Sequence, residues 1–528
     1  MSPILNFCHH FITSSKTTAD DLLLPICSMA SCIQAIPFEL LQETFLKNTE
    51  LDDIQHDRLT TARFCSQVCR SWRSILLQSP RVWGRLLDLD YLEKSKSAWK
   101  KELVSRIGDA PIWMEGRIRQ STYSVVVSVL EKKWQNVQIL QLRGSLEQYP
   151  TADWSFLGRA APNLERLFIH FPDPWDITPK YSSILFNNAA PKLRQFEFSA
   201  AFQLDASAPW FSNLHTLILS TEKTVTDILT MLKATPRLEH LHILRHCVIT
   251  EEDARIFQID LPCLKFLHLA WAECSEVVPF LESISPSPRC LLSLEKYAAV
   301  TTHGSTSVMR KMFRAILRWL VAYGGAGYLP KDITLNVIGG SSSGVNFLWI
   351  HGSNPGTELP RYVRTSLDVQ FPYSNAYDTF MKPLIASSPF SSVLRLRLIV
   401  FTHKHNDCFL PFLRTFSSVT HFISDPKSIG ALCNSSLDET QPHFFPHLRT
   451  VEVRPALKEA RDWIAAASQL RTVCNFLEHR VAIGLPVSVL DIYNLTPYIH
   501  DHGLNEQVKD RIHKIEGLFV KWGPKHKA

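Results

Sequence analysis

The stretch IPFELLQETF (residues 36–45) and the stretch VCRSWRSIL (residues 68–76) decide how the first part of this chain folds. Pro37 suits the first turn of a helix, where its missing N–H costs nothing, and Glu39 suits the positive end of the helix dipole. Apolar residues recur at three- and four-residue spacing in both stretches, which predicts two short helices with one apolar face each. Two such helices cannot bury all of this surface against each other. The pattern therefore indicates a face that packs on a partner or on the rest of the chain.

The second helix is expected to be a single helix that ends at Pro80. One apolar stripe is expected along it: Phe64, Val68, Trp72 and Ile75. Arginines occupy the opposite side, so this helix is expected to have one solvent-exposed face and one buried face.

Taken in order, the patterns L-P-x-E-L-L-x-E-x-F, V-C-R-x-W-R-x-I-L and P-x-x-W resemble the F-box, in the F-box-like version common in fungal proteins. Here Ile36 replaces the usual Leu, and a polar segment (residues 47–61) widens the gap between the helices. The resemblance covers about a tenth of the chain. Members of this family bind the Skp adaptor of an SCF-type cullin–RING ubiquitin ligase through the motif. The resemblance implies that eight residues contact this adaptor: Pro37, Leu40, Leu41, Phe45, Val68, Cys69, Trp72 and Ile75.

The length and composition fit a globular chain of more than one compact unit. A chain of 528 residues is too long for one compact core, and 45% hydrophobic with 20% charged residues is an ordinary composition. The net charge of +6 is small for this length, which argues against a dedicated nucleic-acid binder. Twelve scattered cysteines indicate reduced thiols, and no apolar run is long enough to span a membrane.

Five segments follow from the patterns. They are a mobile leader (1–33), an F-box-like domain (34–87), a connecting helix (88–111), an irregular leucine-rich-repeat-like solenoid (112–500) and a terminal helix with a basic tail (501–528). The terminal helix is expected over residues 505–521.

A degenerate L-x-x-L-x-L pattern recurs through the largest segment. Its first six copies start 21 to 29 residues apart, which is the period of leucine-rich repeats: Val137, Leu164, Leu193, Leu214, Leu238 and Leu264. Each copy predicts a short strand, and residues 225–233 predict a helix that returns the chain. The expected fold class is therefore α/β, with a small N-terminal all-α F-box-like unit followed by an irregular leucine-rich-repeat-like solenoid. An ordinary α/β domain with chance spacings is the alternative.

In a solenoid of this kind, the residues between the inward leucines face the concave side, which binds partners. Aromatic and arginine side chains are the types that anchor protein interfaces. His240 and His242 are expected to point the same way on their strand, toward solvent or a ligand. The residues expected on the target-binding face are Arg143, Arg166, Phe168, His170, Glu197, His240, His242, Phe266, His268, Arg395, Arg397, Glu452 and Arg454.

Three other patterns suggest chemistry and are better explained without it. Residues 340–344 match the G-x-S-x-G nucleophile elbow around Ser342, but the residues that follow read as loop, where an elbow needs a helix. Residues 306–322 carry a stripe of arginines. This stripe fits the solvent-exposed face of an outer helix better than the polar face of a helix that lies on a membrane. Two groups of possible metal ligands lack the paired short spacings of a zinc site. These groups are His240, His242, His246 and Cys247, and His403, His405 and Cys408.

The favoured function is a substrate-receptor subunit of an SCF-type ubiquitin ligase, with the F-box-like unit on the Skp adaptor and the solenoid on an unknown target protein. This role is implied by the resemblance, whereas the two-part layout follows from the residue patterns. It implies no catalytic residue, cofactor or metal, no nucleic-acid or membrane partner, and a cytoplasmic or nuclear location. The alternatives are a protein-interaction scaffold that engages no ligase, a serine hydrolase at Ser342, and a nucleic-acid binder that uses the concave arginines.

Overall fold

The chain, described from a computed structural model, folds into two compact units. Unit 1 comprises residues 1–144 and 161–164, and unit 2 comprises residues 145–160 and 165–528. The leader predicted for residues 1–33 lies outside the described residues. The structure describes residues 36–50, 58–144, 154–170, 184–198, 204–220, 223–244, 247–248, 258–270, 274–285, 287–288, 290–295, 306–325, 331–338, 343–349, 365–371, 374–400, 406–435, 443–454, 464–465, 469–496 and 506–523.

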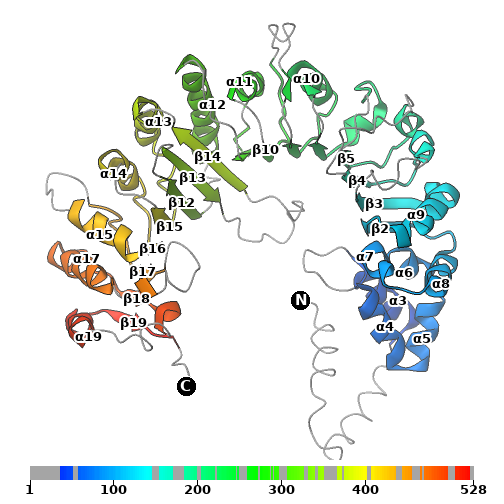
Figure 1. Cartoon of the computed structure of the whole chain (residues 1–528), viewed down its shortest axis with the longest axis horizontal. Coiled ribbons are helices and arrows are strands. Elements are labelled where there is room, and N and C mark those ends of the chain that lie inside the picture. The colour runs from blue at the N-terminus through cyan, green and yellow to red at the C-terminus, as the bar shows by residue number, and fades with distance from the viewer. Residues whose placement is uncertain are drawn as a thin grey trace, which may run out of the picture. The chain divides into compact units, whose positions relative to one another are not determined.

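Unit 1 combines helices with parallel strands in one core. Its helices are α3 (Phe38–Lys47), α4 (Arg58–Val68), α5 (Arg70–Leu77), α6 (Pro80–Gly84), α7 (Leu89–Glu93), α8 (Ser97–Ile107), α9 (Gln120–Lys133) and the 3-10 turn η1 (Trp134–Asn136). Its strands are β1 (Leu87–Asp88), β2 (Ile112–Arg117) and β3 (Val137–Arg143) (Figure 1). β2 pairs in parallel with both β1 and β3, and the side chains of Leu87, Met114 and Leu140 are fully buried. Because α6 and α7 contact β2, the helices and strands of unit 1 are one packed structure.

Unit 2 contains a long row of hydrogen-bonded strands. In the order in which they pair, they are β4 (Arg166–His170), β5 (Gln195–Phe198), β6 (Thr216–Leu219), β8 (His240–Ile243), β10 (Phe266–Ala270), β11 (Leu291–Glu295), β14 (Thr365–Phe371), β13 (Ser343–Trp349), β12 (Asp332–Ile338), β15 (Arg395–Val400), β16 (His421–Ser424), β17 (Thr450–Val453), β18 (Val489–Asp491) and β19 (Phe519–Lys521). Within this row only β13 is antiparallel to its neighbours. β7 (Lys223–Thr224) and β9 (Cys247–Val248) form a separate parallel pair.

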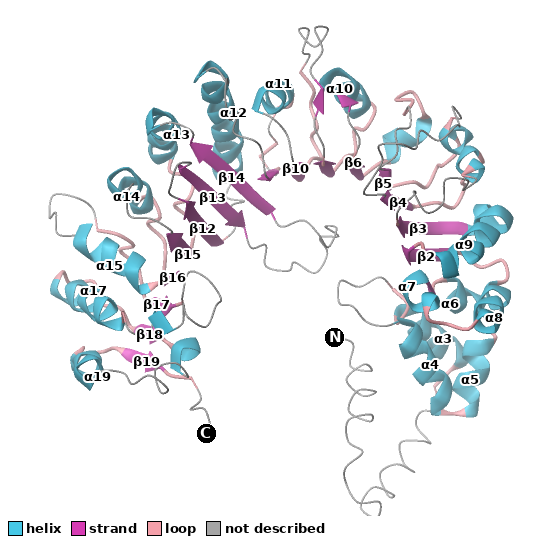
Figure 2. Ribbon diagram, in the orientation of Figure 1, coloured by secondary structure: helices cyan, strands magenta, loops and turns pink. Residues whose placement is uncertain are grey.

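The helices of unit 2 lie along one side of this row of strands (Figure 2). They are α10 (Val225–Lys233), α11 (Cys274–Ser283), α12 (Thr306–Gly325), α13 (Ser374–Ser387), α14 (Asn406–Arg414), α15 (Pro426–Ser435), α17 (Leu470–Ala482) and α19 (Glu506–Lys514). The 3-10 turns are η3 (Ser155–Gly158), η4 (Leu185–Asn188), η5 (Pro209–Asn213) and η7 (Tyr493–Leu495). The core follows the register of the strands, since Phe196, Leu217, Leu241 and Leu267 occupy equivalent positions on successive strands and are all buried. Among the described residues, no helix is both long enough and apolar enough to cross a membrane.

The predicted fold class, a small all-α F-box-like unit followed by a leucine-rich-repeat-like solenoid, is wrong. The described chain is a mixed α/β fold in which all-parallel groups of strands alternate with helices, as in Rossmann-like α/β folds. The segment 34–87, expected to be a separate all-α unit, instead belongs to unit 1 together with strands β1, β2 and β3. The connections in unit 2 do not repeat one unit either: they range from the 3-10 turns η4 and η5 to α12, and antiparallel β13 stands within the row.

The reason for this error is that a buried parallel strand produces the L-x-x-L-x-L pattern whatever connects it to the next strand. The strands expected at the six pattern copies are present as β3, β4, β5, β6, β8 and β10, and the helix expected at 225–233 is α10. The terminal helix is shorter than expected: α19 ends at Lys514, Gly517 adopts φ 76°, and strand β19 follows. A left-handed glycine of this kind ends a helix and turns the chain.

Candidate functional site

Helices α3 and α5 of unit 1 are joined by a small apolar core. The rings of Phe45 and Trp72 meet edge to face, with centroids 5.2 Å apart, which is a favoured arrangement for two aromatic rings. Leu41 and Ile75 are buried beside them on the same two helices. This core fixes the distance between α3 and α5 and therefore shapes the surface above it.

The second predicted helix is in fact two helices, because the chain is extended at Cys69 (φ −155°, ψ 170°). Its thiol accepts a hydrogen bond from the backbone N–H of Trp72 at 3.4 Å and so caps α5, where Ser, Thr, Asp or Asn is the usual cap. The prediction of one continuous apolar stripe is wrong for this reason. Trp72 and Ile75 are buried, whereas Phe64 and Val68, before the break, are more than half exposed.

A groove of about 330 Å³ lies between α3 and α5. Buried apolar side chains form its floor, and exposed polar side chains of α5 stand at its rim. The lining residues are Ile36, Phe38, Leu41, Cys69, Ser71, Trp72, Ser74, Ile75 and Gln78. An apolar floor with a polar rim is the usual anatomy of a protein-binding surface.

Exposed apolar side chains gather on these helices. Of thirteen exposed large apolar side chains among the described residues, six lie between positions 36 and 77: Ile36, Phe38, Leu40, Phe64, Val68 and Leu77. Leu40 has the largest exposed fraction of the six, 59%. Single exposed apolar residues are common on proteins, but a concentration within one short segment marks an interaction surface.

The structure places the eight predicted adaptor-binding residues in three settings. Leu41, Cys69, Trp72 and Ile75 line the groove. Pro37, Leu40 and Val68 are exposed on or next to α3 and α4, outside its lining, and Phe45 is buried in the core beneath. Ile36 and Phe38 line the groove but were not assigned by the motif, although their apolar character next to Pro37 was a visible signal.

The predicted target-binding residues do not form one exposed surface. Arg143 and Arg395 are exposed, and Arg143 belongs to unit 1 whereas the others belong to unit 2. The half-buried residues are Arg166, Phe168, His170, Glu197, His240, Arg397 and Arg454. The buried residues are His242, Phe266, His268 and Glu452. His242 was expected to point toward solvent or a ligand, and the structure rules out solvent because this side chain is buried.

His242 on β8 and His268 on β10 face each other with ring centroids 5.7 Å apart. His268 Nδ1 lies 3.1 Å from Ser293 Oγ, and burial lowers the pKa of His268 to about 4. Burial, and then the neighbouring His268 and His240, hold the pKa of His242 well below its usual value. Both imidazoles are therefore neutral at neutral pH, and within the described residues His242 Nε2 has no hydrogen-bond partner.

Glu452 on β17 is the centre of a charged cluster. Burial alone raises the pKa of Glu452, but the hydrogen bonds from His421, at 3.2 Å, and from Arg454 outweigh it and lower the pKa. Burial, and then the nearby charge of Arg454, lower the pKa of Arg397. A cluster whose charges already pair with one another offers little to a partner.

The competing chemical patterns find no support in the described structure. Ser342 lies outside the described residues, and the chain continues from Ser343 as strand β13, where a nucleophile elbow needs a helix. His246, His403 and His405 also lie outside them. Across the described ranges, no three His, Cys, Asp or Glu side chains are placed to hold a metal ion.

In comparisons with known proteins, no protein-family model and no curated protein matches this chain.

Proposed function

We propose that this chain is a substrate-receptor subunit of an SCF-type cullin–RING ubiquitin ligase. In this proposal the groove between α3 and α5 receives the Skp adaptor, and unit 2 binds a target protein. The observation that carries it is the concentration of exposed apolar side chains within residues 36–77, two of which (Ile36 and Phe38) line the groove, in a segment whose residues resemble the F-box motif. A receptor of this kind acts in the cytoplasm or the nucleus.

The exposed apolar side chains of this segment support docking of a protein. Leu40 and Val68 are each more than half exposed, and Phe38 is nearly so. Burying one such side chain contributes about 1.5–3 kcal/mol, so a few of them buried together supply a large share of the free energy of a specific complex. The buried floor holds α3 and α5 in place, so little conformational entropy is lost when a partner binds.

The test is binding of purified Skp adaptor to the full chain by co-purification and titration calorimetry. Substitutions belong on the exposed apolar side chains of α3 and α4, because Leu41 and Trp72 are buried and truncating either one unfolds unit 1 as readily as it removes a contact. The Leu40→Glu, Val68→Glu double variant places two charges in the proposed interface. We expect it to weaken adaptor binding at least ~10-fold, since a buried unpaired charge is strongly unfavourable.

Phe519→Glu is the matched control, because Phe519 on β19 is equally exposed but lies in unit 2. It is expected to bind the adaptor like the parent chain, with an unchanged circular dichroism melt in all three proteins. Adaptor binding that is the same in the double variant and the parent contradicts the docking face. A folded parent chain that does not bind the adaptor overturns the ligase role, and a protein-interaction scaffold then takes its place.

A further inference from the structure

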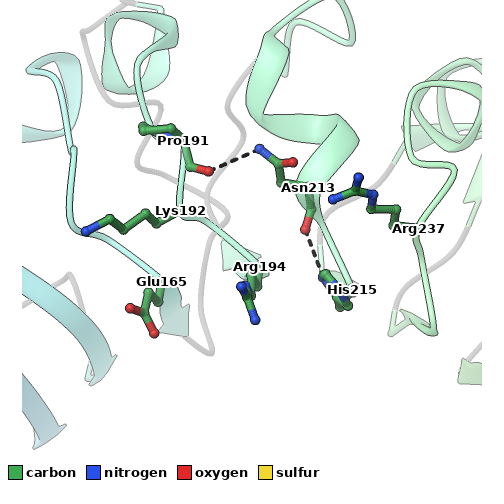
Figure 3. Close-up of a pocket in the computed structure, with 7 residues that line it drawn as sticks. All are labelled: Glu165, Pro191, Lys192, Arg194, Asn213, His215 and Arg237. Carbon is green, nitrogen blue, oxygen red and sulfur yellow. Dashed lines mark hydrogen bonds between the residues drawn. The ribbon is translucent and has the colours of Figure 1, made fainter.

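A second pocket, of about 340 Å³, lies in unit 2 where the chain enters strands β5, β6 and β8. Its lining residues are Glu165, Pro191, Lys192, Arg194, Asn213, His215 and Arg237 (Figure 3). Arg194 and His215 each directly precede a strand, and the His215 N–H donates to the Arg194 carbonyl oxygen at 2.8 Å. The parallel pairing of the strands therefore sets these two side chains next to each other.

The lining is positively charged. Lys192, Arg194 and Arg237 carry three positive charges against the one negative charge of Glu165. Figure 3 shows Lys192 extending away from both arginines. Within the described residues, the side chains of Arg194 and Arg237 have no hydrogen-bond or ion-pair partner. These two guanidinium groups are therefore the donors that a ligand in the pocket can use.

The next acidic residue along this edge of the sheet does not neutralise the pocket. Glu239 follows His215 in the row, since its N–H donates to the His215 carbonyl oxygen at 2.8 Å. The carboxylate of Glu239 already pairs with Lys265 at 2.8 Å. Among the residues that the structure describes, the positive charge of Arg194 and Arg237 is therefore not paired.

The polar groups between the arginines are held in place. Asn213 Nδ2 donates to the Pro191 carbonyl oxygen at 3.1 Å, and His215 Nδ1 lies 2.9 Å from the Asn213 carbonyl oxygen. Since a carbonyl oxygen only accepts, Nδ1 carries the proton in this pair, and the His215 ring is held in one orientation. The floor of the pocket is thus ordered before any ligand arrives, which reduces the entropy lost on binding.

We infer that this pocket binds a carboxylate of an acidic peptide segment, held by the guanidinium groups of Arg194 and Arg237. Arginine presents paired N–H groups that match the two oxygens of a carboxylate. Sites for phosphate groups commonly use free backbone N–H groups, but here those of Arg194 and His215 are bonded to the neighbouring strand. Glu165 also disfavours a doubly charged anion. The inference rests on the proposed role of unit 2 and gives that role a chemical class of target.

The test is fluorescence anisotropy of the full chain with a short labelled peptide that alternates glutamate and serine. A peptide with glutamine in place of glutamate measures the contribution of the carboxylates. We expect the glutamate peptide to bind and the glutamine peptide not to bind. The Arg194→Gln, Arg237→Gln double variant is expected to bind the glutamate peptide at least ~10-fold more weakly. It loses both guanidinium groups and therefore their charge-assisted hydrogen bonds to the carboxylate.

Arg471→Gln is the matched control, since Arg471 is an exposed arginine on α17 in the same unit and is expected to leave peptide binding unchanged. Equal binding by the double variant and the parent overturns the inference. So does tighter binding of inorganic phosphate, of a phosphoserine peptide or of a short RNA than of the glutamate peptide. Adaptor binding is measured on the same double variant and is expected to match the parent. A loss of peptide binding and a loss of adaptor binding can therefore be told apart.

Discussion

At the scale of single residues, the inward or outward direction of a side chain is what the sequence failed to predict. His242 and His268 were expected on the target-binding face, yet both are buried against each other and Phe266. Period-two alternation separates the two faces of a strand, but it does not say whether the second face is covered. His242 and His268 are buried although the helices of unit 2 lie along one side of the row of strands, and burial keeps both imidazoles neutral.

This histidine pair makes the stability of unit 2 depend on pH. The folded pKa of His268 is about 4, below the usual 6.5, so the unfolded chain takes up a proton between these values while the folded chain does not. Stability is therefore complete above about pH 6.5 and falls as the pH drops toward 4, by about 3 kcal/mol for His268 alone. Denaturant unfolding at pH 7.5 and at pH 4.5 measures this loss.

The loss on acidification is expected to shrink in a His242→Leu, His268→Leu double variant and to persist in His513→Gln, which changes an exposed histidine. The comparison between proteins matters, because carboxylates also begin to protonate at the lower pH. If the double variant loses as much stability as the parent, the histidine pair is not the cause.

At the scale of elements, one arginine ties the first helices of unit 1 to its sheet. Arg58 at the start of α4 forms an ion pair with Glu115 on β2. Its Nη1 donates to the carbonyl oxygens of Thr49 and Arg85 at 3.1 and 2.9 Å. A buried guanidinium with several acceptors links these segments, and the helical pattern of residues 36–87 gave no sign of this link.

Arg58→Gln is expected to destabilise unit 1 by roughly 2–4 kcal/mol, because it leaves Glu115 and two carbonyl groups without their donor. Thermal unfolding followed by circular dichroism measures the change. Arg81→Gln is the matched control, since Arg81 is exposed on α6 and the same substitution there is expected to change stability by no more than about 0.5 kcal/mol. Equal effects of the two substitutions contradict a structural role for Arg58.

The positions of elements were more predictable than their limits. The strands at the L-x-x-L-x-L copies and helix α10 lie where the pattern places them, because buried apolar side chains determine both. The end of α4 was not predictable, since the extended backbone at Cys69 depends on a thiol acting as a cap. For the groove, half of the eight assigned residues line it, and the lining residues Ile36 and Phe38 stand at motif positions to which the resemblance assigned no docking role.

At the scale of the whole molecule, the sequence pattern gave a wrong fold class from correctly placed strands. The L-x-x-L-x-L pattern depends only on which side chains of a strand are buried. A repeat architecture also requires that the segments connecting the strands have similar lengths and structures. Those connections differ here, from the turn η4 to the helix α12, and their lengths are set by segments without a strong period. In unit 1, β3 was predicted from the pattern, whereas β1 gave no pattern because it is only two residues long.

Two compact units with separate cores predict two unfolding transitions of the full chain in scanning calorimetry. Arg58→Gln is expected to lower only the transition of unit 1, whereas acidification toward pH 4 in the parent lowers mainly that of unit 2, which contains the histidine pair. Because a ligand that binds only the folded state raises its stability, the Skp adaptor should raise the first transition and the glutamate peptide the second. The Leu40→Glu, Val68→Glu variant should lose the first effect and keep the second. A single transition that all four perturbations move together would show that the two units unfold as one, and the separation of adaptor docking from target binding would then be wrong.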